Sequence, residues 1–597
     1  MSTAILPAPA HRNYNRFLLL VAGLGGLLYG VDVGIIASAL PYLEATSGLN
    51  AGQLSFIVAA VLLGSVISTL FAGTLADWMG RKNLMALSGV LFVASIPMIA
   101  LSHGYSALVL GRLLQGISAG LIGVVIPLYL AECLSKDDRG KGTGIFQWLL
   151  TLGIVTAAAI GIYFSMQVDA VAKLGNATQL LAYKDTAWRR IFWVSLPPGV
   201  LFVIGSFLVA ESPRWLHRRG KIDAARAALL RSRTNEQAEL ELKEMAATAA
   251  AEQAGASAGA ARESLLHRKY VIPFVLACII LACNQATGVN SIIGYNTTIL
   301  LQSGLSDVAA HWGYLILTTV NFLVTMAGVA LVDRKGRKFL LSIGSAGIIV
   351  SLLVVGTLFH RTEKLRVDTG AAVQALVTNE QCATISFNQA TAEKLLATSG
   401  EAARALAGRP ATLVVIYSYG DFRAATTVVR SDDATAKPVE ITRDSCLPPN
   451  KVVAFFSNPF ADLAVARTAP LKIENALITP VPSERNGWIT AIAIFAFMAC
   501  FAVGPGVCVW LALSELMPTR IRSNGMSIAL LINQAVSTGI AAVFLPTVGR
   551  FGYSTMFFAF AGCTVVYFIT AAFFLPETKG RTLEEIEEHF AKGSSKS

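Results

Sequence analysis

Charged residues are scarce in this sequence. Asp, Glu, Lys and Arg make up 14% of its 597 residues and hydrophobic residues make up 54%, whereas soluble globular proteins contain about 25% charged residues. The composition therefore excludes an ordinary soluble domain and indicates a protein that crosses a membrane several times. Apolar windows of about 20 residues, the length of one membrane span, number twelve and lie near residues 17–40, 54–75, 83–102, 107–133, 144–166, 190–210, 271–300, 311–332, 339–359, 488–515, 524–546 and 553–575.

Motifs for metal binding and for phosphate binding are also missing. The seven histidines are scattered without the spacing of a metal site. No glycine-rich phosphate loop followed by Lys-Ser or Lys-Thr occurs, which argues against ATP-driven transport. We expect no metal, no cofactor and no enzymatic activity.

Basic residues outnumber acidic ones, and the formal net charge is +11. They stand in alternate short connections, such as Arg81–Lys82 and Arg139–Lys141, whereas the connections at 44–52 and 102–106 contain none. This alternation follows the positive-inside rule and predicts that both termini are cytoplasmic. The positive charge thus indicates contact with a lipid bilayer and not with nucleic acid.

The second half of the chain repeats charged motifs of the first half. "GTLADWMGRK" at 73–82 returns as "GVALVDRKGRK" at 328–338, where Asp77 and Arg81 match Asp333 and Arg337 at an offset of 256 residues. "AECLSKDDRG" at 131–140 returns as "SELMPTRIRS" at an offset of 383. The offset grows by 127 residues, which indicates an insertion within the polar segment 360–486. Two similar helical halves are typical of secondary transporters.

These features predict an all-α membrane protein with twelve transmembrane helices in two six-helix repeats, and a small extracytoplasmic α/β insertion. The expected parts are an N-terminal half at 1–210, a cytoplasmic linker with short helices at 211–270, spans seven to nine at 271–359, the insertion at 360–486, spans ten to twelve at 487–576, and a cytoplasmic tail at 577–597.

Several motifs carry a resemblance to a known family. "DWMGRK", "VDRKGRK", "ESPRWL", "NQATGVNSIIGYNTT", "GPGVCVW" and "LPETKGRTLEEIE" resemble the signatures of the sugar porter branch of the major facilitator superfamily. The stretch "LGGLLYGVDVGIIASAL" at 24–40 is most similar to bacterial galactose–proton and arabinose–proton symporters. The resemblance implies a major facilitator fold that imports a hexose or pentose with a proton by alternating access. It also implies a monomer in the inner or plasma membrane.

Asp32 and Arg112 are charges that lie deep inside apolar runs. An aspartate at the centre of a span costs about 2.5–3.5 kcal/mol on insertion scales, and two opposite charges cost less as a pair. In the resembling symporters an aspartate stands at this place, and in animal facilitators an asparagine does. We therefore expect Asp32 to bind the transported proton with Arg112 as its partner; a static ion pair is the alternative.

Polar side chains in mid-span are the candidates for the sugar site. Amides both donate and accept hydrogen bonds, and an aromatic ring packs on the apolar face of a sugar. The resemblance places the site at Gln147, Asn284, Gln285, Asn290, Asn321, Asn533 and Trp510. Asn284 stands where the family usually has glutamine, which leaves the sugar open, and each amide could instead join two helices. Tyr29 and Tyr295, placed opposite each other, are candidates for an outer gate, with simple packing as the alternative.

The cytoplasmic ends of the spans carry a charge network that is present twice. Exposed ion pairs contribute only about 0–1 kcal/mol each, which suits a reversible gate. Solvated charges that set the topology are the alternative. The first set is Asp77, Arg81, Glu132, Arg139, Glu211 and Arg214, and its repeat is Asp333, Arg337, Glu515, Arg522 and Glu577.

Two of the eight cysteines, Cys382 and Cys446, lie in the segment that the topology places outside. Disulfides form in oxidising compartments, so we expect these two to pair. The insertion and Asn284 also keep an inositol or polyol symporter open as an alternative. A facilitative uniporter, a sugar sensor that does not transport and an enzyme tethered to the membrane are further alternatives.

Overall fold

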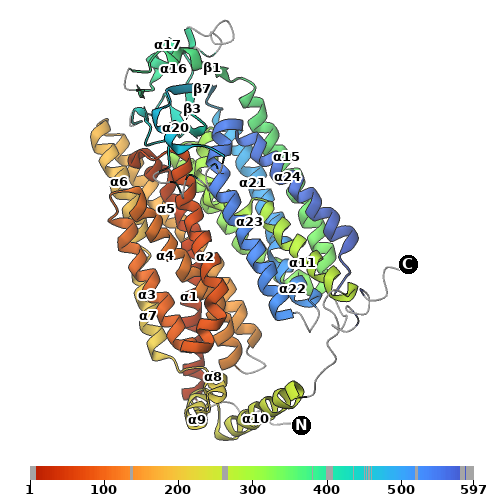
Figure 1. The fold of residues 1–597 in the computed structure, drawn as a ribbon. Helices are drawn as coiled ribbons and strands as arrows, with labels where there is room; N and C mark the ends of the chain where they lie inside the picture. The colour runs from red at the N-terminus through yellow and green to blue at the C-terminus, as the bar shows by residue number, and fades with distance from the viewer. Residues whose placement is uncertain are drawn as a thin grey trace.

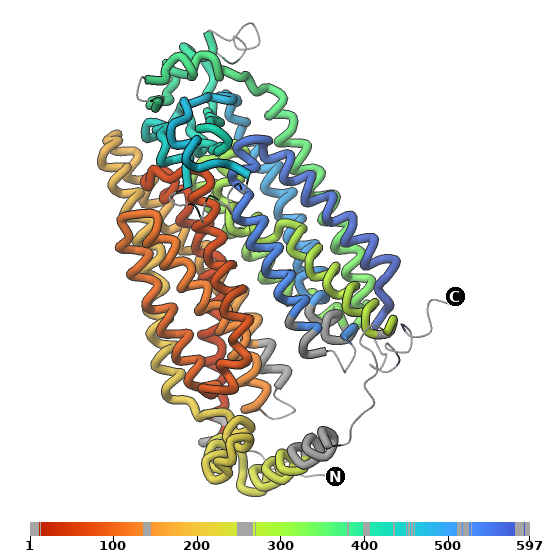
Figure 2. Tube along the Cα trace, in the orientation of Figure 1, coloured from red at the N-terminus to blue at the C-terminus, as the bar shows by residue number. Residues whose placement is uncertain are grey.

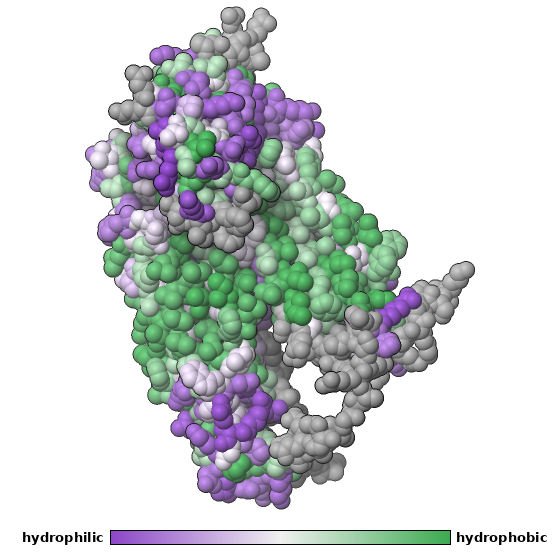
Figure 3. Space-filling model, viewed as in Figure 1, coloured by the Kyte–Doolittle hydropathy of each residue, from purple (hydrophilic) through white to green (hydrophobic). Residues whose placement is uncertain are grey.

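The computed structural model describes residues 9–134, 139–257, 267–378, 381–397, 406, 408–433, 436–448, 451, 454, 458, 460–517, 522–578, 585 and 590. Two helical halves stand side by side, a cap of strands and short helices covers one end, and three helices at 213–257 lie at the other (Figure 1). Among the described residues, twelve helices are long and apolar enough to cross a membrane, which confirms the predicted number of spans. Apolar side chains form a broad band between two polar ends (Figure 3).

The N-terminal half consists of the first six spans. Its helices are α1 (Pro9–Ser47), α2 (Ala51–Met79), α3 (Arg81–Ala100), α4 (Tyr105–Cys133), α5 (Arg139–Ala172), α6 (Ala177–Trp193) and α7 (Leu196–Leu208). Helices α6 and α7 form one span that begins at Ala177, earlier than the predicted 190. The span begins earlier because the helix extends beyond the apolar run, and the added part, α6, contains polar residues.

The C-terminal half contains the other six spans, interrupted by the cap. Its helices are α11 (Arg268–Ala286), α12 (Val289–Gly294), α13 (Asn296–Gln302), α14 (Asp307–Lys335), α15 (Arg337–Glu363), α21 (Glu484–Val503), α22 (Pro505–Leu516), α23 (Arg522–Phe551), α24 (Tyr553–Ile569) and the π-helix η1 (Thr570–Phe574). The linker between the halves holds α8 (Pro213–Arg218), α9 (Ile222–Leu230) and α10 (Asn235–Ser257).

Local signals in the sequence set several helix ends. The Asn50 side chain accepts a hydrogen bond from the Gln53 N–H at 2.8 Å, and the Gln53 side chain accepts one from the Asn50 N–H at 3.1 Å, a capping box that starts α2. Gly80 separates α2 from α3 with φ +94°, and its repeat counterpart Gly336 separates α14 from α15 with φ +88°. Glycine is favoured at both because these φ angles are strained for residues with a Cβ.

Hydrophobic packing differs between the two ends of the bundle. Near the cap, one continuous core joins residues of both halves, for example Ile35 and Leu54 with Ile299 and Phe544. Towards the other end, the halves have separate cores, one around Phe92 in the N-terminal half and one around Leu341 in the C-terminal half. The helices of the two halves accordingly meet below the cap and diverge towards the linker helices (Figure 2). The bundle is closed at the cap end.

The cap spans 364–483, between α15 and α21, slightly less than the predicted 360–486 because the two helices extend past their apolar runs. Its elements are β1 (Val367–Asp368), α16 (Gly370–Gln374), β2 (Ala383–Ile385), α17 (Gln389–Ala397), β3 (Ala411–Tyr419), β4 (Phe422–Ala425), β5 (Val429–Arg430), β6 (Val439–Ile441), α20 (Leu463–Thr468) and β7 (Leu471–Pro480). A five-stranded sheet has the order β1-β7-β3-β4 with β5 also paired to β3, and β2 pairs with β6.

All described strand pairs of the cap are antiparallel. The expected α/β insertion is therefore a mainly antiparallel sheet with short helices beside it. The tight turn between β3 and β4 requires that pair to be antiparallel, since parallel strands need crossovers of a dozen or more residues. The cap has a core of its own, which includes Leu413, Tyr417 and Ile478.

Candidate functional site

Asp32 on α1 and Arg112 on α4 lie side by side in the N-terminal half. Arg112 Nη1 is 3.8 Å from Asp32 Oδ1, and the two residues are 2% and 1% exposed. Neither carboxylate oxygen has a hydrogen-bond partner among the described residues. Arg112 also donates to Gln115 Oε1 at 2.6 Å, and its guanidinium lies over the ring of Phe192. The two charges expected to pair are thus adjacent and buried.

The negative charge of Asp32 is balanced by Arg112 alone among the described residues, since the carboxylate accepts no hydrogen bond. A buried carboxylate without hydrogen bonds is costly as an ion, and Arg112 is the cation that offsets this cost. A proton on Asp32 would remove the charge and release the guanidinium, which Gln115 already holds. Asp32 can therefore be either protonated or ion-paired with Arg112, and the change between the two states requires little movement of the side chains.

Three of the predicted amides form one connected cluster in the C-terminal half. Asn290 Nδ2 donates to Gln285 Oε1 at 2.9 Å and to Ser537 Oγ at 2.8 Å, and Gln285 Nε2 donates to Asn533 Oδ1 at 3.2 Å. Asn533 Nδ2 donates to the Leu281 carbonyl at 2.9 Å. Gln285 and Asn290 are half-buried, so the cluster keeps polar atoms available for a ligand with hydroxyl groups.

A break in span seven brings Gln285 and Asn290 together. Gly288 lies between α11 and α12 with φ +81°, and a Cβ on it would collide with the ring of Phe560. The turn places two amides five residues apart within hydrogen-bond distance. Ser537 joins them from α23 and is a site residue that the sequence reasoning missed, since a serine in an apolar helix has no distinctive signal.

Three other predicted sugar-site residues, Asn284, Gln147 and Asn321, form no hydrogen bond with this cluster among the described side chains. Asn284 is buried and donates to the Pro505 carbonyl at 3.4 Å, so it joins α11 to α22. Gln147 is exposed on α5, and Asn321 is half-buried on α14. The side chain of Trp510 lies outside the described part of the chain.

Tyr295 lies at a contact between the two halves near the cap. Its hydroxyl donates to the Ala541 carbonyl at 3.0 Å and lies 3.3 Å from Ser55 Oγ of α2, and its ring stacks on Phe544. The predicted partner Tyr29 lies elsewhere: it packs near Gly123 with the apolar core at the other end of the N-terminal half. Tyr295 therefore lies at the contact between the halves at the cap end, whereas Tyr29 packs away from it.

Further hydrogen bonds between the halves surround Asp307, the first residue of α14. The Tyr42 hydroxyl donates to Asp307 Oδ2 at 2.7 Å, and the Ser165 hydroxyl donates to the same oxygen at 2.8 Å. Tyr314 donates to the Gly34 carbonyl at 2.8 Å. Sequence reasoning missed these residues because an acid at the start of a helix is common. Together they close the path at the cap end.

Comparison with known families decides what this arrangement belongs to. The family model described as "Sugar (and other) transporter" matches residues 18–379 and 471–590. The chain belongs to this sugar transporter family. Its match skips most of the cap, so the cap is an addition to the common fold.

Several relatives of this sugar transporter are similar over most of their length. It is 24% identical to the glucose transporter GlcP of Staphylococcus epidermidis, over 96% of this chain and 97% of the relative. It is 30% identical to the galactose-proton symporter of Escherichia coli, over 58% of this chain and 70% of the relative. It is 26% identical to the proton myo-inositol cotransporter of Homo sapiens, over 95% of this chain and 81% of the relative.

The fold resembles solved structures of the same architecture. The xylose transporter XylE of Escherichia coli, in a partially occluded inward open conformation, superposes with a TM-score of 0.62 at 20% identity. The match covers 96% of this chain and all of that chain. The predicted major facilitator fold is thereby confirmed.

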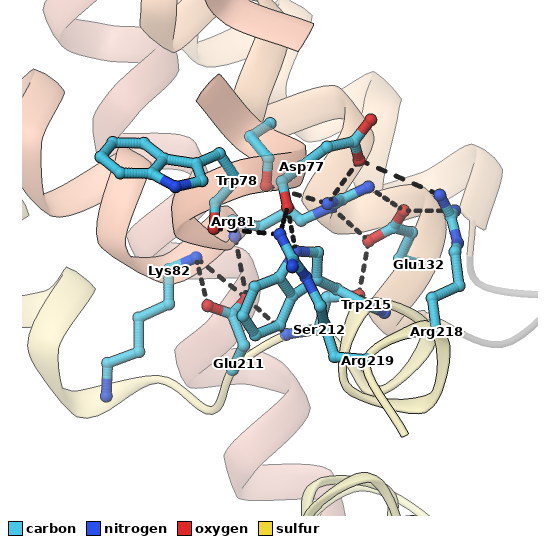
Figure 4. A network of polar contacts seen from close by, with 11 residues as sticks. Asp77, Trp78, Arg81, Lys82, Glu132, Glu211, Ser212, Trp215, Arg218 and Arg219 are labelled. Atoms are coloured by element: carbon cyan, nitrogen blue, oxygen red, sulfur yellow. Dashed lines mark hydrogen bonds and ion pairs between the residues drawn. The ribbon is translucent and has the colours of Figure 1, made fainter. Parts of the chain in front are cut away.

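A network of ion pairs lies beside α8 of the transporter, where α2 and α4 end and α3 begins (Figure 4). Arg81 donates to both carboxylate oxygens of Glu132, from Nε at 2.8 Å and from Nη2 at 2.9 Å, and it pairs with Asp77 at 2.9 Å. Ser212 also donates to Glu132, and Arg218 lies 3.4 Å from it.

Glu211 occupies the start of α3. Its carboxylate accepts hydrogen bonds from the backbone N–H groups of Arg81 and Lys82 at 3.0 and 3.1 Å, a site that favours an anion. Burial raises the pKa of Glu211, while these hydrogen bonds act in the opposite direction. The repeat reproduces this contact, since Glu577 accepts from the N–H groups of Arg337 and Lys338 at 3.0 and 3.2 Å.

Two predictions about the charge network are wrong. The central pair is buried, with Arg81 1% and Glu132 6% exposed, because the arginine is covered where three helices meet. The exposed side chain of Arg214 makes no ion pair or hydrogen bond with the described residues, whereas Ser212 and Arg218 contact Glu132. The side chains of Arg139, Asp333, Glu515 and Arg522 lie outside the described part of the chain.

The predicted disulfide in the cap is also wrong. Cys382 and Cys446 are both free thiols. Cys446 Sγ donates to the Phe422 carbonyl at 3.3 Å, and Cys382 Sγ lies 3.1 Å from Thr378 Oγ1. Each thiol contacts another group and not the other thiol, and burial raises the pKa of Cys446 to about 11.

Proposed function

We propose that this sugar transporter imports a monosaccharide together with a proton by alternating access. The observation that carries the proposal is the buried pair of Asp32 and Arg112, whose carboxylate has no hydrogen bond among the described residues. The amide cluster of Gln285, Asn290 and Asn533 supplies donors and acceptors for sugar hydroxyls. The galactose-proton symporter among the relatives supports the same chemistry.

In the transport cycle, the described state is the one closed at the cap end. The hydrogen bonds of Tyr42 with Asp307, of Tyr314 with the Gly34 carbonyl and of Tyr295 with Ser55 hold it closed. Sugar leaves towards the linker side, where the cores of the two halves are separate. Release of the proton from Asp32 restores its pair with Arg112 before the transporter turns to face outwards. The proton thereby gives the cycle its direction.

The orientation and setting are part of this proposal. Both termini and the linker helices face the cytoplasm and the cap faces outwards, because the basic connections lie at the linker end. The protein works as a monomer in the inner or plasma membrane. The domain boundaries are those of the helices and the cap described above.

A polyol symporter is the second candidate. The human proton myo-inositol cotransporter is 26% identical over nearly the whole chain, and Asn284 is occupied with the Pro505 carbonyl, which removes one amide that a hexose site of this family would use. A competition panel separates the candidates. Unlabelled hexoses, pentoses and inositols are added to vesicles that take up one labelled sugar.

The same vesicles test coupling. A protonophore should abolish accumulation above equilibrium, and addition of sugar should make the external medium alkaline. Uptake that reaches only equilibrium and ignores the protonophore would make the protein a uniporter. Saturable binding without any uptake would make it a sensor.

A further inference from the structure

A large cavity lies between the cap and the outer ends of the spans. It has a volume of about 730 Å³, within the range of about 300–1,000 Å³ typical of small-molecule sites. Its floor comes from α1, α5, α6, α13 and α14, and its roof from β3, β5, β6 and the segments beside them. Tyr42 and Asp307 belong to the floor and are hydrogen-bonded to each other. The cavity thus lies on the outer side of the closed path, apart from the amide cluster.

Most charges around the cavity are already neutralised by partners. Asp432 pairs with Arg430 at 2.8 Å, and Asp433 pairs with Lys184 at 3.6 Å. Asp307 is held by Tyr42 and a serine hydroxyl. These groups shape the walls, and none of them needs a ligand.

Two carboxylates and one hydroxyl are among the groups that remain for a ligand. Glu44 on the floor and Glu440 on the roof have no hydrogen-bond or ion-pair partner among the described residues, and both line the cavity. On β6 the flanking Val439 and Ile441 are buried in the cap, so Glu440 projects away from the cap core. Thr298 is 5% exposed, lines the cavity and has a hydroxyl without a hydrogen-bond partner.

This set of groups selects the chemical class of the ligand. The unpaired carboxylates repel anions and accept hydrogen bonds from hydroxyl groups. Apolar side chains on the same walls, including Pro41, Leu49 and Leu305, suit the C–H faces of a ring. We propose that the cavity is a second binding site for a neutral polyhydroxy compound, a sugar or polyol, separate from the transport site. This second site rests on the proposed function only in its ligand class, a sugar or polyol.

The walls of this outer site belong to parts that must separate when the transporter opens outwards. The cap is continuous with α15 and α21 of the C-terminal half, whereas Glu44 belongs to the N-terminal half. Contacts across the cavity rim join them: Asn50 Nδ2 donates to the Ser445 carbonyl, and Lys437 Nζ donates to the Thr46 carbonyl. A ligand between these walls stabilises the closed state, so an excess of external sugar slows its own uptake.

The test combines binding and uptake in the full-length protein. Labelled glucose, galactose, xylose and myo-inositol are bound to the purified chain in lipid nanodiscs, with Asn290→Ala, Glu440→Gln and Glu44→Gln as variants. Glu393→Gln, a change of the same type on exposed α17 of the cap, is the control. Loss of a hydrogen bond to a carboxylate should weaken the outer site about tenfold or more.

We expect two classes of site in the wild type, of which Asn290→Ala removes one and Glu440→Gln or Glu44→Gln weakens the other. Uptake by the wild type should fall at high sugar concentration, and Glu440→Gln should relieve this inhibition without changing uptake at low concentration. A single class of site, unaffected by both glutamate variants, overturns the outer site. If Asn290→Ala has no effect while the glutamate variants do, the outer site stands and the proposed transport site fails.

Discussion

Tyr42→Phe should shift the transporter towards its outward-facing state. The change removes the hydroxyl that donates to Asp307 Oδ2 at 2.7 Å across the two halves. It keeps the ring, which stacks on His311 at 5.6 Å between centroids. The hydrogen bond can exist only while the outer ends are together, so its free energy acts on the conformational equilibrium alone.

The size of this shift follows from the surroundings of the acceptor. A hydrogen bond to a charged group contributes about 1.5–3 kcal/mol. The Asp307 side chain is 31% exposed and keeps its bond from Ser165, so water and the serine compensate in part. We expect the lower value, about 1.5 kcal/mol, which raises the outward-to-inward ratio about tenfold.

Distances between spin labels measure this ratio. Leu174 and Phe551 are exposed at the outer ends of the N-terminal and C-terminal halves, and each is replaced by a labelled cysteine in a background without native cysteines. Tyr42→Phe should enlarge the population with the longer distance. Tyr163→Phe, on an exposed tyrosine of α5, is the control and should change nothing. An unchanged distribution in Tyr42→Phe would refute the assignment of this bond to the outer closure.

Three further predictions concern the amide cluster, the charge network and the cap. Asn290→Ala removes two hydrogen bonds of the amide cluster and should raise the apparent KM for uptake about 10- to 100-fold with normal membrane insertion; an unchanged KM would exclude Asn290 from the site. Glu132→Ala leaves Arg81 buried without its main partner and should lower the free energy of unfolding by about 3–5 kcal/mol, whereas Asp77→Ala should change thermal stability little because Asp77 is 65% exposed. Replacement of 367–480 by a short polar loop should leave uptake measurable, because the family match skips most of this segment; a folded but inactive deletion would place the cap in the transport path.

The sequence predicts correctly the features that a large free-energy cost or a repeated motif restricts to few arrangements. A charge inside an apolar run needs a partner, so Asp32 and Arg112 predict each other although they lie on different helices. Charged motifs that recur in order reveal the two halves, and the contact of Glu211 with the start of α3 recurs at Glu577. These signals do not depend on knowing the packing.

The features that it misses depend on how ordinary residues meet in space. Ser537, Tyr314 and Asp307 are unremarkable in their own helices. Ser537 meets Asn290 only because α23 lies beside α12, and Tyr314 and Asp307 find their partners only where one half packs on the other. The burial of Arg81 likewise follows from the convergence of three helix ends and not from its neighbours in the chain. The separate partners of Cys382 and Cys446 depend on the strand order of the cap, which two isolated cysteines do not reveal.

Proton-driven accumulation by Asp32→Asn tests the central claim most directly. The purified protein is placed in liposomes with an imposed proton gradient, and internal sugar and proton flux are followed together. A potential of 100 mV supplies about 2.3 kcal/mol per proton, enough for about 40- to 50-fold accumulation at one proton per sugar. The wild type and Asp223→Asn, a control on exposed α9, should accumulate sugar and take up protons. Asp32→Asn should bind sugar without either; accumulation at the wild-type level would show that the proton is carried elsewhere.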